Sequence, residues 1–207
     1  MPIAAMSADT IGFVQDAGMK AEYAALVRDA AGGDRAAMER LLMRAQETAY
    51  RFSLLVCGHP EDAEDVMQES LLKTYQHVKR ISDPTSFRTW LYTTVRNACL
   101  MKRRRHVGEP AAFVPLEDGD GSTDGALAGL ADQSPSPDQQ LVSNWMDSRL
   151  REALKILPAS YRMVVVMREM EGLSTKEVAE ITGFSEANVK TRLRRARLML
   201  RRHLEAE

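Results

Sequence analysis

The chain has 207 residues, of which 44% are hydrophobic, 28% charged and only 6% aromatic. This composition is typical of a globular protein rich in helix formers, and it excludes collagen-like, mucin-like and coiled-coil rods. The net charge of −1 conceals two basic regions, with 14 basic against 11 acidic residues in 21–105 and 13 against seven in 141–202. Between them, residues 106–140 carry seven acids and no Lys or Arg. Each basic region is therefore expected to meet a polyanion.

Cysteine usage and hydropathy indicate the cellular compartment in which the protein is expected to act. Cys57 and Cys99 lie 42 positions apart and neither belongs to a C-x-x-C pair, so the spacing indicates neither a disulfide framework nor a zinc site. The longest apolar run is 163–167, far below the roughly 20 residues that span a bilayer. The first 19 residues lack the Lys or Arg of a signal peptide. We therefore expect a cytoplasmic protein without membrane insertion.

The first basic region predicts a helical bundle. One helix is expected around residues 21–31, and Asp34 is placed to cap a second helix that Gly58 ends. Pro60 suits the first turn of a third helix that runs to about Lys79. Ser86 is placed to cap a fourth helix that ends in the basic run 102–105. Apolar residues at steps of three and four define the faces expected to point inward: Met38, Leu41, Ala45, Ala49, Phe52 and Val56; Ala63, Val66, Met67, Leu71, Thr74 and Tyr75; Phe87, Trp90, Leu91, Thr94, Ala98 and Met101.

Residues 106–140 predict a flexible acidic linker. They contain five Gly and four Pro, and they offer too little apolar surface to offset the entropy of ordering. If flexible, these 35 residues span roughly 33 Å, taking about 5.5 Å times the square root of length. A second helical domain follows from about residue 141. The predicted fold class is therefore all-α, with an N-terminal helical bundle and a C-terminal helical domain joined by this linker.

The sharpest local signal lies in residues 173–190 of the second domain. Ser174 and Glu177 have the spacing of a capping box, and Gly183 suits the left-handed turn that ends a short helix. Ser185 is placed to cap the next helix, and Ala179 is small where two helices would cross. These features predict a helix-turn-helix. The helix after the turn carries an apolar stripe and a basic one: Val189, Leu193, Ala196, Leu200 and Leu204; Lys190, Arg194, Arg197 and Arg201.

The basic stripe favours DNA binding, because the N-terminal residues of a recognition helix reach base edges while flanking cations contact phosphates. The alternative is a solvated amphipathic helix whose arginines keep it soluble.

The third expected helix of the bundle has an acidic flank with Asp65, Gln68, Glu69 and Leu72, which suits a partner helix bearing Arg but also fits a solvated face.

Aromatic and cationic residues alternate on the fourth expected helix, as in proteins that stack single-stranded bases. Trp90 falls on the apolar stripe, so a core role is the better interpretation for it. The amide of Asn97 offers a donor and an acceptor for a base edge, although Asn97 is also compatible with an ordinary surface position.

These segments, in this order, resemble a sigma factor of bacterial RNA polymerase, of the extracytoplasmic-function group. The sequence DAEDVMQE at 62–69 looks like the segment that docks on the polymerase clamp helices, although Leu71 and Tyr75 stand where the family usually has an aromatic residue and Trp. The sequence FRTWLYTTVRNA at 87–98 looks like the −10 promoter segment, in which the position of Asn97 lines a pocket for a flipped base. The helix-turn-helix looks like the module that reads the −35 element.

The resemblance implies an N-terminal extension at 1–20, a region 2-like domain at 21–105, the linker at 106–140 and a region 4-like domain at 141–204. It implies a factor that binds core polymerase and directs promoter-specific initiation, with duplex −35 DNA, melted −10 DNA and an anti-sigma factor as partners and without cofactor, metal or catalytic residues. The implied contacts are Asp65, Gln68, Glu69 and Leu72 for the polymerase; Arg96, Asn97, Lys102, Arg103 and Arg104 for the −10 element; and Ser185, Asn188, Lys190, Thr191, Arg194, Arg195 and Arg197 for the −35 element.

Three rival functions remain open at this point. An enzyme is disfavoured because the four histidines are scattered and no nucleophile has a credible base. A sigma mimic that sequesters a regulator should have lost the cations of its DNA-facing helix, which this chain retains. A repressor with one DNA-reading domain does not account for the clamp-like and −10-like segments.

Overall fold

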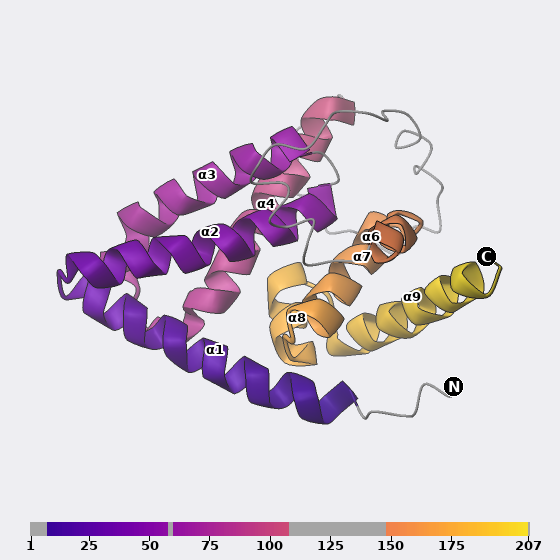
Figure 1. Cartoon of the computed structure of the whole chain (residues 1–207), viewed down its shortest axis with the longest axis horizontal. Coiled ribbons are helices and arrows are strands. Elements are labelled where there is room, and N and C mark those ends of the chain that lie inside the picture. The colour runs from indigo at the N-terminus through magenta and orange to yellow at the C-terminus, as the bar shows by residue number, and fades with distance from the viewer. Residues whose placement is uncertain (1–7, 58–59, 108–147, 207) are drawn as a thin grey trace.

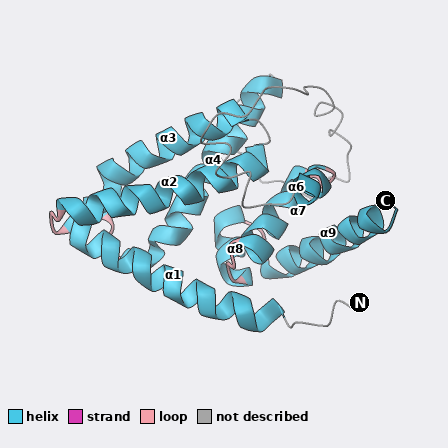
Figure 2. Cartoon of the chain, viewed as in Figure 1, coloured by secondary structure: helices cyan, strands magenta, loops and turns pink. Residues whose placement is uncertain are grey.

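The computed structural model describes residues 8–57, 60–107 and 148–206. Within these ranges, four α-helices form an N-terminal domain, and four more form a C-terminal domain that packs against it (Figure 1). No strand occurs in the described ranges (Figure 2). The N-terminal domain contains α1 (Ala8–Ala31), α2 (Arg35–Cys57), α3 (Pro60–His77), the 3₁₀ turns η1 (Val78–Arg80) and η2 (Pro84–Ser86), and α4 (Phe87–Val107). The C-terminal domain contains α6 (Ser148–Lys155), α7 (Ala159–Val165), the π-helical turn η3 (Val166–Met170), α8 (Thr175–Thr182) and α9 (Glu186–Ala206).

Helix ends in the N-terminal domain follow local side-chain chemistry. The Asp34 carboxylate accepts hydrogen bonds from the amides of Ala36 and Ala37 at 2.8 and 3.1 Å, which confirms the predicted cap of α2. The predicted cap at Ser86 is wrong. Asp83 caps the preceding η2 turn by accepting from the Thr85 amide at 2.9 Å, while the Ser86 hydroxyl donates to the Asp83 carbonyl at 2.7 Å. The 3₁₀ turn thus leads directly into α4.

The core of the bundle follows the predicted stripes closely. Leu41, Ala45, Ala49 and Phe52 of α2 are fully buried, and Trp90 packs against this core beside Phe87. Two expectations fail at the ends of stripes, where a helix passes the edge of its neighbours. Tyr75 is 61% exposed and Met101 is 52% exposed. Thr74 is buried as expected, and Ser70, which the predicted stripe does not include, is buried as well. Each of those hydroxyls donates to a carbonyl one turn earlier in its own helix, at 2.9 Å for Thr74 and 2.7 Å for Ser70. Both buried hydroxyls therefore have a hydrogen-bond partner.

The helix-turn-helix forms as predicted. The Ser174 hydroxyl accepts from the Glu177 amide at 3.2 Å, while the Glu177 carboxylate accepts from the Ser174 amide at 2.9 Å, which makes a reciprocal capping box. Gly183 ends α8 with φ +76°, a backbone conformation that residues with a side chain rarely adopt. Val178, Ile181 and Val189 are buried between α8 and α9. The turn therefore holds α9 at a fixed angle to α8.

The capping box makes a pH-dependent contribution to stability. Burial raises the pKa of the Glu177 carboxyl, but hydrogen bonds from Ser174 and the charge of Lys20 outweigh it, so the pKa lies below its ordinary value of 4.5. A depressed carboxyl pKa stabilises the fold above the ordinary value and loses this effect as the pH falls through the folded value. We expect Glu177→Gln to lower the free energy of unfolding by about 1 kcal/mol at pH 7. The difference from the unsubstituted chain should shrink below pH 4.5 in urea titrations. Glu180→Gln, at an exposed position of α8, is the matched control; a difference that does not change with pH would contradict this account.

Cys57 and Cys99 form a disulfide between α2 and α4, with their Cα atoms 5.4 Å apart. The expectation that no disulfide was indicated is therefore wrong. The reason is physical: two cysteines far apart in sequence meet only because α2 and α4 pack side by side, and sequence spacing carries no sign of that. The disulfide also removes the support that cysteine usage gave to a reducing compartment.

Two predicted boundaries differ from the observed helix bounds, and most of the predicted linker lies outside the described residues. The helix expected around 21–31 begins earlier, at Ala8, so it takes in much of the proposed N-terminal extension. The predicted linker begins within α4, which reaches Val107, and residues 108–147 are not described. Among the described residues, no helix combines the length and apolar character that a membrane span requires.

Candidate functional site

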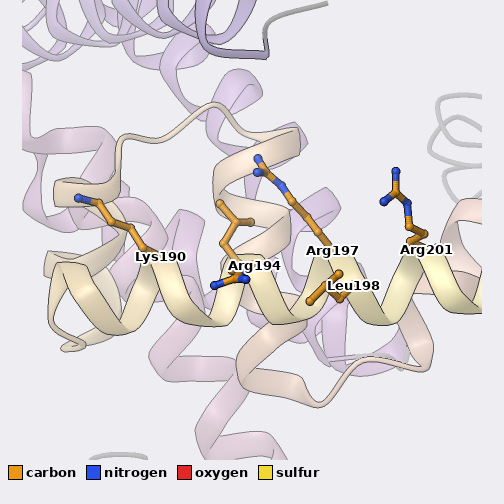
Figure 3. A pocket seen from close by; sticks show the side chains of 6 residues that line it. Lys190, Arg194, Arg197, Leu198 and Arg201 are labelled. Carbon is orange, nitrogen blue, oxygen red and sulfur yellow. The ribbon is translucent and has the colours of Figure 1, made fainter. Parts of the chain in front are cut away.

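A row of cations follows one side of α9. Lys190, Arg194, Arg197 and Arg201 are exposed and line an open groove of about 540 Å³, with Leu193 and Leu198 between them. Figure 3 shows the four cationic side chains spaced along the helix. Arg197 is also paired with Glu169 of η3 at 2.6 Å. The predicted basic stripe is thus an exposed feature of the second helix of the helix-turn-helix.

The start of α9 uses two predicted DNA-contacting residues to build the helix itself. The Ser185 hydroxyl accepts from the Asn188 amide at 3.2 Å and caps the helix. The Asn188 side-chain oxygen accepts from Arg192 at 2.6 Å. Arg192 is buried, with its guanidinium 4.4 Å from the ring centroid of Phe184. Asn188 is therefore half-buried and committed to an internal contact in this arrangement.

Thr191 and Arg195 share an exposed flank of α9 beside the cation row. The Thr191 hydroxyl donates to the Ala187 carbonyl at 2.9 Å, and Arg195 donates to the Tyr161 hydroxyl at 3.4 Å. These contacts are at the surface, where water or a ligand competes for them. Lys190, Thr191, Arg194 and Arg195 together form one solvent-facing surface on the N-terminal half of α9.

The acidic flank of α3 is exposed as well. Gln68, Glu69 and Leu72 are open to solvent, and the side chain of Leu72 is 58% exposed. Asp65 is ion-paired with Lys102 of α4, and Glu69 pairs with Lys73 at 2.6 Å. Exposed pairs of this kind contribute about 0–1 kcal/mol each, so a partner's cations displace them at small cost.

On α4, the residues predicted for the −10 element are in different environments. Asn97 is exposed, and its side-chain oxygen accepts from Arg96 at 3.2 Å. Lys102 is partly exposed and reaches Asp62 and Asp65 of α3. Arg103 and Arg104 continue the helix toward Val107. Arg96 is only 8% exposed, and it donates to the Thr182 carbonyl at the end of α8 at 3.1 Å. Of the predicted set, Asn97 is thus exposed and Lys102 partly exposed on α4, whereas Arg96 lies against the end of α8.

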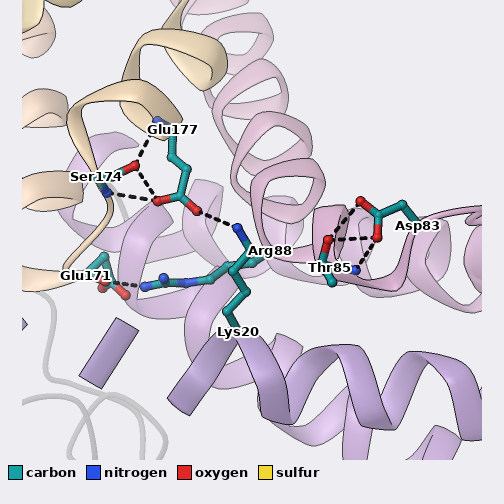
Figure 4. A network of polar contacts seen from close by, with 7 residues as sticks. All are labelled: Lys20, Asp83, Thr85, Arg88, Glu171, Ser174 and Glu177. Carbon is teal, nitrogen blue, oxygen red and sulfur yellow. Dashed lines mark hydrogen bonds and ion pairs between the residues drawn. The ribbon is translucent and has the colours of Figure 1, made fainter. Parts of the chain in front are cut away.

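A buried polar cluster joins the two domains, and Figure 4 shows one of its contacts, between Arg88 and Glu171. Glu171, which follows η3, is 4% exposed, and its carboxylate accepts from Arg51 of α2 at 2.8 and 2.7 Å. Tyr92 of α4 donates to the same carboxylate at 2.5 Å, and Arg88 of α4 donates to the Glu171 carbonyl. We call Arg51, Arg88, Tyr92 and Glu171 the interdomain cluster.

Protonation in the interdomain cluster is set by burial and by the carboxylate. Burial, together with the Glu171 charge, raises the pKa of Tyr92 well above its ordinary value, so the phenol keeps its proton and donates it. Hydrogen bonding to Glu171 raises the pKa of Arg51, which stays charged. The buried Glu171 carboxylate is therefore held by hydrogen bonds from Arg51 and Tyr92.

Sequence reasoning missed this cluster. The sequence places Tyr92 among the aromatic residues that alternate with cations on the fourth expected helix, and its patterns assign no role to Arg51, Arg88 or Glu171. One signal was available: Arg88, Tyr92 and Arg96 lie four residues apart on α4, which puts three large polar side chains on one face of a helix. Their partners lie more than 75 positions away in the chain, and sequence periodicity does not identify such partners.

Within the described residues, no group of three or more His, Cys, Asp or Glu side chains is arranged to hold a metal ion. The described residues expose the cation row of α9, the acidic flank of α3 and part of α4.

Comparison with known proteins agrees with this arrangement. Residues 38–108 match the family model described as Sigma-70 region 2, and residues 147–200 match Sigma-70, region 4. The chain is 35% identical over 183 residues to the ECF RNA polymerase sigma factor SigL of Mycobacterium tuberculosis, covering 87% of this chain and 96% of that one. It is 31% identical over 175 residues to a probable RNA polymerase sigma factor, RfaY, of Xanthomonas campestris pv. campestris. That match covers 84% of this chain, which spans only 42% of the Xanthomonas relative's length.

A solved structure has the same fold. The sigma factor RpoE, solved in complex with the anti-sigma factor NepR from Bartonella quintana, matches 82% of this chain and 97% of its own with a TM-score of 0.56 and 21% identity. The chain belongs to the sigma-70 family of RNA polymerase sigma factors, in the extracytoplasmic-function group. Proteins of this family recognise promoters and direct transcription initiation.

Proposed function

We propose that this chain binds core RNA polymerase through the α3 flank, holds the melted −10 strand on α4 and reads the duplex −35 element with α9. In this assignment Asp65, Gln68, Glu69 and Leu72 contact the polymerase. The −10 contacts are Arg96, Asn97, Lys102, Arg103 and Arg104, and the −35 contacts are Ser185, Asn188, Lys190, Thr191, Arg194, Arg195 and Arg197. The chain acts by binding, without catalysis of its own, in the cytoplasm.

The observation that carries this proposal is the pairing of two opposite surfaces in one chain. An acidic helix flank is exposed on the N-terminal domain, and a cation row is exposed on the second helix of the helix-turn-helix. Phosphates of duplex DNA attract the cation row and repel the acidic flank, so the two surfaces suit different partners. A repressor does not need an acidic flank that binds polymerase, and a sigma mimic does not need cations that bind DNA.

An anti-sigma factor is the proposed regulator. Support comes from the fold shared with RpoE, whose structure was solved with the anti-sigma factor NepR. An apolar groove edged by cations suits an acidic amphipathic segment as well as DNA, because both bring negative charge to α9.

Gel retardation with core polymerase tests the proposed function. Promoter duplex is incubated with the chain alone, with core polymerase alone and with both. We expect a sequence-specific complex only with both proteins. Specific retardation by the chain alone would favour a repressor, and no specific retardation in any mixture would contradict the assignment.

Asn97 is expected to act after the duplex opens. A base is available to its amide only when local pairing is lost, which itself costs a few kcal/mol. Asn97→Ala should therefore leave closed-complex binding within about twofold and slow promoter opening about tenfold. Permanganate probing measures opening on duplex promoter and on a template with a pre-melted bubble. The defect should be smaller on the bubble; an unchanged opening rate on duplex promoter would contradict the role.

A further inference from the structure

Arg192 is a buried cation on a helix whose other cations are largely exposed. It lies in the N-terminal half of α9 and is only 7% exposed, whereas Thr191, Arg194 and Arg195 around it face solvent. Burying a guanidinium is unfavourable unless its N–H groups meet acceptors. Arg192 therefore has a role inside the domain, which differs from that of the cations at the surface.

The Arg192 guanidinium joins α9 to two other segments of the C-terminal domain. Its Nε donates to the Asn188 side-chain oxygen at 2.6 Å, one turn earlier in α9, and its Nη1 donates to the Ser160 hydroxyl of α7 at 2.9 Å. The guanidinium carbon lies 4.4 Å from the ring centroid of Phe184, in the turn before α9, and 5.5 Å from that of Tyr161 in α7. The planar fork of an arginine meets two oxygens and two rings together, which the compact ammonium of a lysine does not do.

These contacts reach two of the residues proposed to read the −35 element. An arginine only donates, so the Asn188 amide presents its oxygen to Arg192 and turns its NH₂ group away from the guanidinium. The Tyr161 ring beside Arg192 also carries the hydroxyl to which Arg195 donates at 3.4 Å. Arg195 follows Arg192 by three residues, about 60° around the helix. The directions of the Asn188 and Arg195 side chains therefore depend on where Arg192 is held.

We propose that Arg192 is the positioning residue of the −35 surface. It contacts no base; it fixes the rotation of α9 against α7 and the preceding turn, so that Asn188 and Arg195 enter the major groove in one orientation. This role rests on the proposed function, since it concerns the surface assigned to the −35 element. Base contacts need such placement, because a bidentate pair with a base edge tolerates little change in direction. A loosely held α9 still attracts phosphates through its exposed cations, but it distinguishes bases less well.

The test measures base preference, because preference separates positioning from stability. Arg192→Met keeps a long buried side chain and removes the donors. Ser160→Ala removes the acceptor on α7 and leaves Arg192 in place, so this variant should fold even if Arg192→Met does not. Arg202→Met is the matched control, because it removes a cation from an exposed position of the same helix. Each full-length variant is bound to core polymerase, and its affinity is measured for single-base variants of the −35 element at several salt concentrations.

We expect Arg192→Met to lower the ratio of affinities between the preferred and the other −35 sequences about tenfold. That value lies within the roughly 5- to 150-fold discrimination that one bidentate base contact provides. Ser160→Ala should lower the same ratio about threefold, since one of the anchoring contacts is lost, and Arg202→Met should leave it unchanged. The dependence of affinity on salt should not change in Arg192→Met, because a buried cation neutralises no phosphate.

A role in folding alone, or a phosphate contact, gives a different result. Partial unfolding weakens binding to every sequence in equal proportion, and loss of a phosphate contact does the same while reducing the salt dependence. An unchanged ratio in Arg192→Met would therefore overturn the positioning role. Ser160→Ala decides in the same way if Arg192→Met does not fold.

Hydrogen exchange in the free chain separates failure of this role from failure of the proposed function. In Arg192→Met, the amides of residues 186–193 should exchange at least tenfold faster, with those of α2 unchanged. An unsubstituted holoenzyme that does not discriminate among −35 sequences would contradict the proposed function. Faster exchange at 186–193 would then still support Arg192 as the anchor of α9, and unchanged exchange would overturn it.

Discussion

Replacing Asp65 and Glu69 with Lys is expected to abolish stable binding to core polymerase. Both carboxylates lie on the exposed flank of α3, and the proposed partner surface is basic. Like charges placed against each other at a close interface cost several kcal/mol. A loss of about 3 kcal/mol weakens affinity more than a hundredfold, at 1.4 kcal/mol per tenfold. Biolayer interferometry with immobilised core enzyme measures the change.

The fold should survive this substitution, because Asp65 and Glu69 make only surface ion pairs with Lys102 and Lys73. Glu39→Lys combined with Glu47→Lys on α2 is the matched control, since it makes the same change in net charge at exposed positions outside the flank. We expect normal core binding by the control. Normal core binding by the α3 variant, with an unchanged circular dichroism spectrum, would refute the assignment of this flank.

Alanine at Arg195 is expected to weaken binding to the −35 duplex by about 1–3 kcal/mol and to relax base preference at one or two positions. Arg195 lies on the exposed N-terminal half of α9, where side chains of a recognition helix enter the major groove. Its guanidinium has the fork that pairs with O6 and N7 of guanine. The loss should depend on the identity of the contacted base. Holoenzyme affinity for a panel of single-base variants of the −35 element measures it.

Arg202→Ala is the control for Arg195→Ala. Arg202 is exposed near the C-terminal end of α9, beyond the half that enters the groove. Removing this side chain should weaken binding to every sequence equally and slightly. It should also make binding less dependent on salt, as expected for the loss of a phosphate contact. Equal losses on every −35 variant after Arg195→Ala would assign Arg195 to the backbone instead of a base.

Much of the fold follows from patterns within single helices. The residues Leu41, Ala45, Ala49 and Phe52 recur at steps of three and four, and such a stripe has to be buried for α2 to be stable. The capping box of Ser174 and Glu177 and the turn at Gly183 depend on neighbours in sequence, so they too were predictable. The cations of α9 directly follow the buried Val189, Leu193 and Ala196 in sequence, so the cation row borders the apolar stripe, about 100° around the helix.

The contacts between helices were harder to predict, because they depend on how distant segments pack. The Cys57–Cys99 disulfide and the Arg51–Glu171 ion pair join residues 42 and 120 positions apart. Arg96 shows the consequence for the candidate site. Its sequence context resembles a DNA contact, yet its guanidinium lies against the end of α8. A polar residue on the face of a helix contacts solvent, a ligand or another domain, and sequence alone does not separate these roles.

In vitro transcription tests the central claim most directly. Core polymerase from a bacterium with extracytoplasmic-function factors is supplied with this chain and a library of promoter fragments, and transcript 5′ ends are sequenced. The account predicts start sites that appear only when the chain is present, preceded by a shared pair of motifs near −10 and −35. Start sites identical to those of core polymerase alone, from a chain that is folded and bound to the enzyme, would contradict it.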